Sequence, residues 1–321
     1  MKKDVIVEVK VDEKKKLPGW ALLFSWLMLL MSIFTLYTGR RVYNKTFNTK
    51  PHEITRKRIH ERRLKQLDAY EHQKFLIESN KNKYNIEAIH IKSKIDTNKI
   101  IILIHGIRGN YFDLLPAAFR YLKDGYNVMM YNQRQSGLTG GNTSTFGLYE
   151  KFDLEEVATI ARRIYKGGQV GVHGFSMGAA TAIMQSELNE ASNLVDFYIL
   201  DAPFHTMAST VELAVRSKET TKIPSWYVKF SGDTFLRLRK RVAYKDIAPI
   251  NAIHHCSKPI LLLHGENDDV TCPNGSRQLF AAISHNNRRL EILPDSDHCT
   301  AYYRSEKDYF DRIYKFISDF L

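Results

Sequence analysis

Ser176 lies in the stretch Val170–Ala180, which reads VGVHGFSMGAA. Glycines stand two residues before it and two residues after it, at Gly174 and Gly178. This G-x-S-x-G pattern is typical of a sharp turn from a strand into a helix, which holds the serine in a strained conformation. The glycines are needed because the turn brings backbone segments too close together for a Cβ atom. Ser176 is therefore a candidate nucleophile for acyl transfer.

A serine nucleophile needs a base, and it needs a carboxylate that orients the base. After such a turn, the acid should come next in the chain and the histidine last. Asp268 follows a strand expected at Pro259–Leu263, and His298 follows a strand expected at Leu290–Leu293. Ser176, Asp268 and His298 all lie after the carboxyl ends of strands. We therefore expect their side chains to meet at one edge of a sheet.

The oxyanion of acyl transfer needs hydrogen-bond donors, which the backbone supplies in this pattern. One should be the amide of Met177, directly after the nucleophile. The other should be the amide of Ile107, in the loop after a strand expected at Lys99–Ile104. Asp201, at the end of another expected strand, is the alternative to Asp268 as the acid.

The three cysteines are Cys256, Cys272 and Cys299, too few and of the wrong parity for a disulfide framework. Cys272 and Cys299 closely follow the candidate acid and the candidate base. Either they line the pocket or meet one another, or they are small residues that fill space. Acyl transfer by this constellation requires no metal ion and no organic cofactor, and we expect none.

The pattern from residue 70 to residue 321 alternates between short apolar runs and helical segments. A hairpin is expected at Lys74–Ser79 and Ile86–Lys92, with continuous apolar strands after it. The alternation predicts an α/β domain with a mostly parallel, doubly wound sheet. The other expected elements are helices at Tyr111–Lys123, Phe152–Tyr165, Ser176–Leu188, Arg277–Ser284 and Lys307–Leu321, and strands at Asn127–Tyr131, Gln169–His173 and Val195–Leu200.

One section, at about 205–252, interrupts this alternation with short helical patterns that include Trp226, Tyr227 and Phe230. An insertion between two strands should lie over the carboxyl ends of the sheet, where loops commonly carry function. We interpret it as a small helical lid over the substrate pocket. The alternative is a helical excursion that makes no contact with the substrate.

The segment 17–38, which follows a tail at 1–16, contains no charged residue. At about 1.5 Å per residue it is long enough to cross a hydrocarbon core of about 30 Å. No small-x-small cleavage site follows it, which favours a retained single-pass transmembrane helix over a signal peptide. A buried core helix is the alternative.

The segment 39–69 predicts a basic stalk, because ten Lys and Arg against two Glu lie between Gly39 and Gln66, and the whole chain carries +12. Such a segment is attracted to anionic membrane lipids. Nucleic acid is not an expected partner, because the stalk lacks a matching fold signature and interleaved aromatic residues. Six cations precede the apolar segment and seven follow it, so their balance does not decide on which side of the membrane the domain lies.

From about Lys74 to Leu321 the chain resembles an α/β-hydrolase. The matching motifs are the oxyanion motif His105-Gly106, the elbow Gly174–Gly178 and the acid motif His264–Val270. The resemblance implies an α/β-hydrolase fold with Ser176, Asp268 and His298 as the catalytic triad. It also extends to the segment 131–141, with two departures: Asn132 replaces the usual acid and Thr139 the usual serine.

The segment Phe146–Asp153 is similar to that of a membrane-anchored bacterial branch described as serine-aminopeptidase-like or prolyl-oligopeptidase-like. This resemblance implies a small-molecule acyl ester or a peptide as the substrate. We expect an esterase, acting on an acyl-ester or lipid-like substrate, with a serine peptidase as the alternative. A membrane-anchored binding protein without activity is less expected, because all three triad positions are present.

Overall fold

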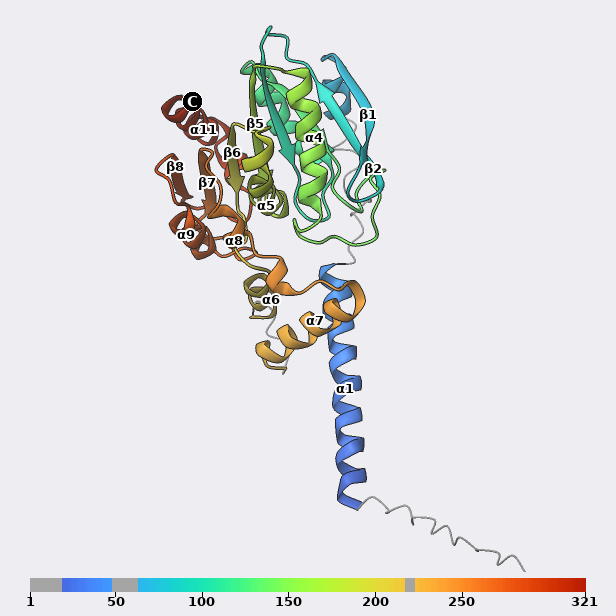
Figure 1. The fold of residues 1–321 in the computed structure, drawn as a ribbon. Coiled ribbons are helices and arrows are strands. Elements are labelled where there is room, and N and C mark those ends of the chain that lie inside the picture. The colour runs from blue at the N-terminus through green and yellow to red at the C-terminus, as the bar shows by residue number, and fades with distance from the viewer. Residues whose placement is uncertain (1–18, 48–62, 217–222) are drawn as a thin grey trace, which may run out of the picture.

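The computed structural model describes residues 19–47, 63–216 and 223–321, and it contains one sheet flanked by helices (Figure 1). The strands are β1 (His72–Ser79), β2 (Tyr84–Ile91), β3 (Lys99–Ile104), β4 (Asn127–Tyr131), β5 (Gln169–Phe175), β6 (Phe197–Asp201), β7 (Ile260–Gly265) and β8 (Arg288–Leu293).

The helices before β6 are α1 (Gly19–Thr46), the 3-10 helix η1 (Tyr111–Leu114), α3 (Leu115–Lys123), α4 (Glu150–Ile164) and α5 (Met177–Ser192). Those after β6 are α6 (Met207–Arg216), α7 (Ser225–Lys240), η2 (Tyr244–Asp246), α8 (Pro249–Ile253), α9 (Pro273–Ala282), α10 (Ala301–Arg304) and α11 (Glu306–Phe320).

The strands form an eight-stranded sheet in the order β1-β2-β4-β3-β5-β6-β7-β8. The pairs β1–β2 and β2–β4 are antiparallel, and the other five pairs are parallel. The predicted hairpin and the predicted mostly parallel α/β sheet are therefore confirmed. Helix α9 begins earlier than the expected Arg277, because Pro273 occupies its first turn, where the missing N–H costs nothing.

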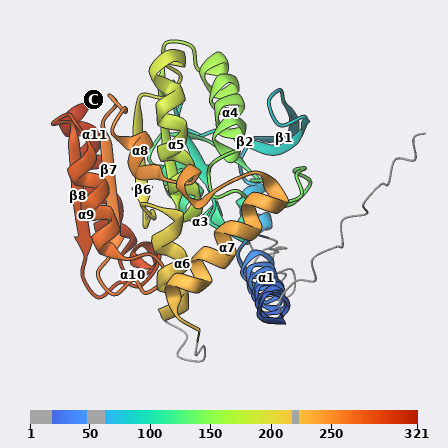
Figure 2. The same cartoon turned by 60° about the horizontal axis from the view of Figure 1, so that its bottom comes forward.

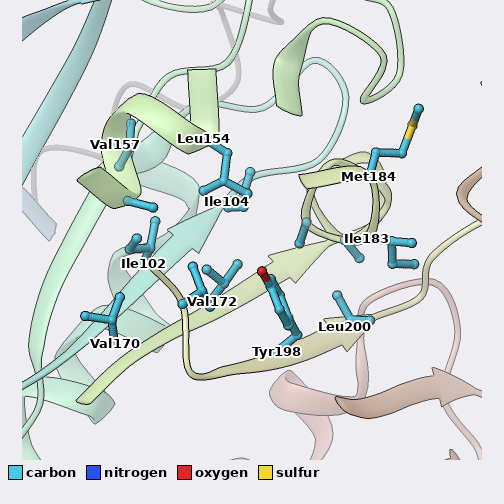
Figure 3. Close-up of a cluster of buried hydrophobic side chains, with 14 of the residues drawn as sticks. Ile102, Ile104, Leu154, Val157, Val170, Val172, Ile183, Met184, Tyr198 and Leu200 are labelled. Atoms are coloured by element: carbon cyan, nitrogen blue, oxygen red, sulfur yellow. The ribbon is translucent and has the colours of Figure 1, made fainter. Parts of the chain in front are cut away.

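Helices cover both faces of the sheet. On one face α4, α5, α8 and α9 pack against side chains such as Ile102 and Val172, with Leu154 and Ile183 from the helices (Figure 3). On the other face α3 and α11 cover the alternate residues of the same strands, for example Ile101. Each such side chain contributes about 1.5–3 kcal/mol when it is fully buried. The two-faced burial explains why these strands read as continuous apolar runs.

Helix α1 is longer than the expected segment 17–38. It continues to Thr46 because one face of its last turns is apolar and buried: Tyr43 and Phe47 are buried, whereas Arg40 and Arg41 are exposed. The predicted helix end at Thr38 is corrected accordingly: the helix continues into the segment predicted as a partly helical stalk, and its residues 39–46 pack against the domain. Residues 48–62 of the predicted stalk lie outside the described residues.

The last part of the predicted stalk also contacts the domain. Residues 63–67 are helical, and Leu67 is buried with Leu64 beside it in the apolar cluster under α3 and α11. Within the described ranges, Leu23–Thr46 of α1 is the one helical segment long and apolar enough to cross a membrane. Most of its large apolar side chains before Thr38 are exposed.

Helices α6 and α7, from the insertion at about 205–252, lie beyond the carboxyl edge of the sheet (Figures 1 and 2). Helix α7 packs beside the end of α1, and α6 packs against α7. A third apolar cluster fills the space between them and the sheet. It joins Phe47 at the end of α1 to Leu236 of α7, and both to Phe146, Met177 and Phe204 near the elbow.

Candidate active site

Ser176 stands at the junction of β5 and α5 with φ 54° and ψ −116°, a backbone conformation that side-chain-bearing residues rarely adopt. A Cβ atom on Gly174 would lie 2.4 Å from the carbonyl oxygen of Gly178, and one on Gly178 would lie 2.3 Å from that of Ile104. Backbone segments therefore approach both glycines too closely for a side chain, as the sequence pattern predicted. The Ser176 amide donates a 2.8 Å hydrogen bond to the carbonyl oxygen of Asp201.

His298 connects the serine to a carboxylate. Its Nε2 lies 2.8 Å from Ser176 Oγ, and its Nδ1 lies 2.7 Å from Asp268 Oδ2. Because Asp268 accepts at Nδ1, the neutral imidazole carries its proton there and presents a lone pair to the serine hydroxyl. The three residues come from separate loops at the carboxyl ends of β5, β7 and β8. The structure thus brings together the three side chains that the sequence analysis selected.

The Asp268 carboxylate is buried and well supplied with donors. Its Oδ1 accepts from the amides of Val270 and Thr271 at 2.8 and 2.9 Å, and its Oδ2 accepts from the Thr271 hydroxyl at 2.9 Å. His264 Nε2 lies 3.1 Å from the same Oδ2. Burial raises the pKa of Asp268, but the hydrogen bonds from His264 and His298 outweigh that effect, so the pKa lies below its usual range. The carboxylate is thereby held ionised.

Asp201, the alternative acid, points elsewhere. Its Oδ2 accepts a 2.6 Å hydrogen bond from the hydroxyl of Tyr309, which in turn lies 3.1 Å from Nε2 of the buried His173. Burial raises the pKa of Asp201 to about 6, with the Tyr309 hydrogen bond acting in the opposite direction. The hydrogen-bond partner of His298 is Asp268, so the geometry favours Asp268 as the orienting carboxylate.

The two amides expected to hold an oxyanion lie on either side of the serine. Met177 is the first residue of α5, and the first amides of a helix have no partner within the helix. Ile107 follows Gly106, which approaches so closely that a Cβ on it would lie 3.3 Å from Ser176 Cβ. Within the described ranges, neither amide donates to a protein acceptor, so both are free to bind an incoming oxygen.

The loop that carries Ile107 is held by His105 of the oxyanion motif together with Gln133, a residue that the sequence analysis did not select. His105 Nε2 accepts from the amide of Gln133 at 2.9 Å, and the Gln133 side chain donates to the carbonyl oxygen of His105. Gln133 Oε1 also accepts from the hydroxyl of Thr181 in α5. One side chain thus connects the loop, the end of β4 and the helix behind the nucleophile. The signal that the sequence offers for Gln133 is its position two residues after β4, at the carboxyl edge of the sheet.

The two departures in the segment 131–141 serve the neighbouring loop. Asn132 Oδ1 accepts from the amide of Tyr111, and its Nδ2 donates to Glu87 at 2.7 Å. Thr139 Oγ1 donates to the carbonyl oxygen of Asn132 and accepts from the amide of Glu87. Both replacements act within loop hydrogen bonding and make no contact with Asp268 or His298 among these bonds.

A cleft of about 380 Å³ opens beside Ser176. Its lining is largely apolar. The described residues that form it come from the loop after β3, η1 and the start of α3, the elbow, the loop after β7, the loop after β8, and α10. Cys299 lines it, whereas Cys272 does not, and both are free thiols. None of these lining residues comes from the insertion, whose helices lie on the Met177 side of the serine. No group of three or more His, Cys, Asp and Glu among the described residues is suited to a metal ion.

Sequence comparison places these features in a family. The sequence model of the prolyl oligopeptidase family matches residues 149–321, which include the elbow, the acid and the histidine. The chain belongs to the prolyl oligopeptidase family of α/β-hydrolases. It is accordingly a serine hydrolase of the α/β-hydrolase type, either an esterase or a peptidase.

One protein of similar sequence and two solved structures of similar fold illustrate the range of similarity. The Bacillus subtilis protein YqkD is 30% identical over 237 residues, which cover 74% of this chain and 76% of YqkD. The Pyrococcus furiosus esterase Pf2001 has the same fold, with a TM-score of 0.64, 21% identity and coverage of 85% of this chain and 99% of that one. Est1E from Butyrivibrio proteoclasticus, with ferulic acid bound, has a TM-score of 0.56 and 14% identity, and covers 76% and 98% of the two chains.

Proposed function

We propose that this protein hydrolyses carboxylic esters by two-step acyl transfer. The Ser176 oxygen attacks the ester carbonyl while its proton passes to His298 Nε2, and the same proton then goes to the departing alcohol. Water enters, loses a proton to His298 and attacks the acyl-enzyme, which releases the acid and returns the proton to Ser176. Asp268 fixes the imidazole orientation and stabilises the imidazolium that forms in each step. The Ile107 and Met177 amides bind the oxyanion.

The observation that carries this proposal is the position of the His298 imidazole, within hydrogen-bond distance of both Ser176 Oγ and Asp268 Oδ2. The cleft supports an ester with an apolar acyl part, because Leu114, Pro116 and Phe175 line it. The similarity to esterases points in the same direction.

A serine peptidase is the second candidate, and the family match favours it. Peptides with a free amino terminus need an anion that binds their ammonium group. Asp113 is the one carboxylate among the described residues of the cleft lining, and it already accepts from the amide of Asn110. We therefore place the ester first.

Turnover of acyl esters of graded chain length, measured beside aminoacyl and prolyl amides, tests the choice of substrate. We expect the esters to be cleaved with the higher kcat/KM, and we expect Ser176→Ala to lose this activity. Cleavage of the amides alone would favour the peptidase, and unchanged ester turnover by Ser176→Ala would overturn the proposed nucleophile.

We also propose that α1 anchors the protein in a membrane and is retained. At its end, Tyr43 packs on Phe235, and Phe47 packs on Phe146 and Tyr244. Removal of the whole helix as a signal sequence would therefore expose the rings of the domain that Tyr43 and Phe47 cover. The intact mass of the protein purified from membranes tests this. A mass that includes α1 is expected, and a mature chain that begins after Thr38 would contradict the proposal.

A further inference from the structure

Helix α7 runs beside α1 in the same direction over about two turns. Near the start of α7, the Tyr227 hydroxyl lies 2.7 Å from Thr35 Oγ1, and the Tyr227 ring stacks on Phe34 at 5.7 Å. Further along, the rings of Phe235 and Tyr43 lie 5.5 Å apart. Through the Tyr227 side chain, the beginning of α7 therefore contacts the part of α1 that precedes its first cations.

Small residues bring the two helices close together. A Cβ atom on Gly39 would lie 2.3 Å from the carbonyl oxygen of Ser231, and one on Gly232 would lie 2.9 Å from Val42. Glycine and serine at such crossings are typical of helix pairs in membranes, where close backbone approach replaces the hydrophobic effect as the source of association. The pairing fixes α7 to α1, so α7 is held at a defined depth relative to α1.

The polar contact between the helices is suited to an environment without water. Thr35 Oγ1 donates to the carbonyl oxygen of Met31 at 2.8 Å, so it accepts the hydrogen bond from the Tyr227 hydroxyl. Both hydroxyl groups are thus satisfied by protein partners. Polar groups within the apolar part of a bilayer require such internal partners.

The outer face at the start of α7 is aromatic and uncovered. Trp226 and Phe230 are one turn apart, and 65% and 57% of their surfaces are exposed. Arg40 is the first cation after the apolar segment of α1, and Thr35 precedes it by five residues, or about 7 Å along the helix. Helices that lie in a membrane interface bury their apolar faces by about 5–10 Å. Trp226 is next to Tyr227, which contacts Thr35, and Phe230 is next to Ser231, which contacts Gly39. Trp226 therefore lies deeper than Phe230, and both lie within this range of depths.

Basic side chains lie at the opposite end of this contact. Arg239 and Arg241 are exposed at the end of α7, and Arg40 and Arg41 are exposed on α1. Arg237 is also exposed, and its Nε lies 2.8 Å from Asp233 Oδ2 in an ion pair. Cations near an anionic membrane surface are attracted to the head groups of its lipids. Along α7 the aromatic residues therefore come at the level of the acyl chains, and the cations come at the level of the lipid head groups.

We propose that the first two turns of α7 insert into the interfacial zone of an anionic lipid bilayer beside α1. Trp226 and Phe230 contact the acyl chains, and Arg237 and Arg239 lie among the head groups. This inference rests on the proposed anchoring by α1. It gives the insertion a role as a second membrane contact, which turns the carboxyl edge of the sheet, with Ser176, toward the bilayer.

Tryptophan fluorescence tests the inference on the full chain, because its three tryptophans are Trp20, Trp26 and Trp226. The variant Trp20→Phe/Trp26→Phe retains Trp226 alone, and the matched control Trp20→Phe/Trp226→Phe retains Trp26 alone. Both are reconstituted into vesicles of phosphatidylcholine and phosphatidylglycerol that carry bromine either near the head group or near the end of the acyl chain. Emission is compared with that in the same vesicles without bromine, with aqueous acrylamide as a second quencher.

We expect blue-shifted Trp226 emission that loses most intensity to bromine near the head group and little to acrylamide. We expect Trp26, near the middle of the apolar segment, to lose most intensity to bromine near the chain end. If Trp26 is quenched by bromine while Trp226 responds only to acrylamide, the inference is overturned and the anchor stands. If bromine quenches neither tryptophan, the anchor and the inference are both overturned.

Discussion

The amide of Ser144 donates a 3.2 Å hydrogen bond to the carbonyl oxygen of Phe47, and so ties the loop before α4 to the residue directly after α1. A second contact joins the same region to the active site: Arg108 donates to the carbonyl oxygen of Lys45 at 2.9 Å, and Arg108 is the neighbour of Ile107. The end of α1 is therefore part of the structure that supports the loop with one proposed oxyanion donor.

This arrangement makes the stability of the hydrolase domain depend on α1. Replacing Phe47, which is 1% exposed, by alanine should lower the free energy of unfolding by about 3–5 kcal/mol, because a cavity forms between α1, Phe146 and Tyr244. Denaturant unfolding of the full chain in detergent measures this. As the control, Leu29→Ala on the exposed part of α1 should leave the unfolding of the domain unchanged. Equal stability of Phe47→Ala and the wild type would contradict this role of α1.

The two buried aspartates near the site should differ sharply in their effect on catalysis. Asp268→Asn should lower kcat by about 10⁴-fold, because the imidazole loses the carboxylate that fixes its tautomer. Asp201→Asn should retain nearly wild-type kcat, because the Asp201 side chain bonds to Tyr309 rather than to His298. Ester turnover of the two variants measures the difference. The reverse ranking would assign the orienting role to Asp201.

Asp201 should instead affect stability in a pH-dependent manner. Its folded pKa of about 6 lies above the ordinary value of 3.8, which applies in the unfolded chain. Below about pH 4 the carboxyl group is protonated and does not lower the stability. As the pH rises through 6 the buried group ionises, and the free energy of unfolding falls. Asp201→Asn removes the cost of ionising this buried side chain. The variant should match the wild type near pH 4 and exceed its stability by up to about 3 kcal/mol above pH 7. Urea unfolding across this range measures it, and a pH-independent difference would contradict the raised pKa.

The strained backbone at Ser176 predicts a difference between two inactive variants. Both Ser176→Ala and Ser176→Gly lose the hydroxyl, but only glycine adopts φ 54°, ψ −116° without strain. Ser176→Gly should therefore be more stable than Ser176→Ala by about 1 kcal/mol, a difference that the unfolding midpoints of the two variants measure. An alanine variant as stable as the glycine variant would mean that the elbow stores no strain.

Much of the site could be predicted because its parts are local. The glycines around Ser176 and the loops with Asp268 and His298 carry their signals within a few residues, and the ends of parallel strands bring such loops together. The choice between Asp268 and Asp201 stayed open, since it depends on where each carboxylate points. Thr271, three residues further on, sets the direction of the Asp268 carboxylate, whereas Tyr309 sets that of Asp201 from 108 residues away in the chain. No local pattern connects Tyr309 to Asp201.

The predicted end of α1 at Thr38 was wrong. Arg40 and Arg41 follow the apolar segment directly, and such cations commonly mark the end of a membrane-spanning helix. In the structure they occupy the exposed face of a helix whose opposite face carries Tyr43 and continues into the domain. This face packs against α7, which lies about 190 residues away in the chain. The spacing of apolar residues within α1 does not predict which helix covers it. The same distance hid the contact between Thr35 and Tyr227.

Covalent labelling with a fluorophosphonate probe tests the proposed nucleophile most directly. The full-length wild-type protein should gain one adduct, on the peptide that contains Ser176, and pre-incubation with an ester substrate should slow its formation. Ser176→Ala should gain none while it keeps a cooperative unfolding transition. Labelling of Ser176→Ala at the wild-type rate, or an adduct on another serine, would contradict the account.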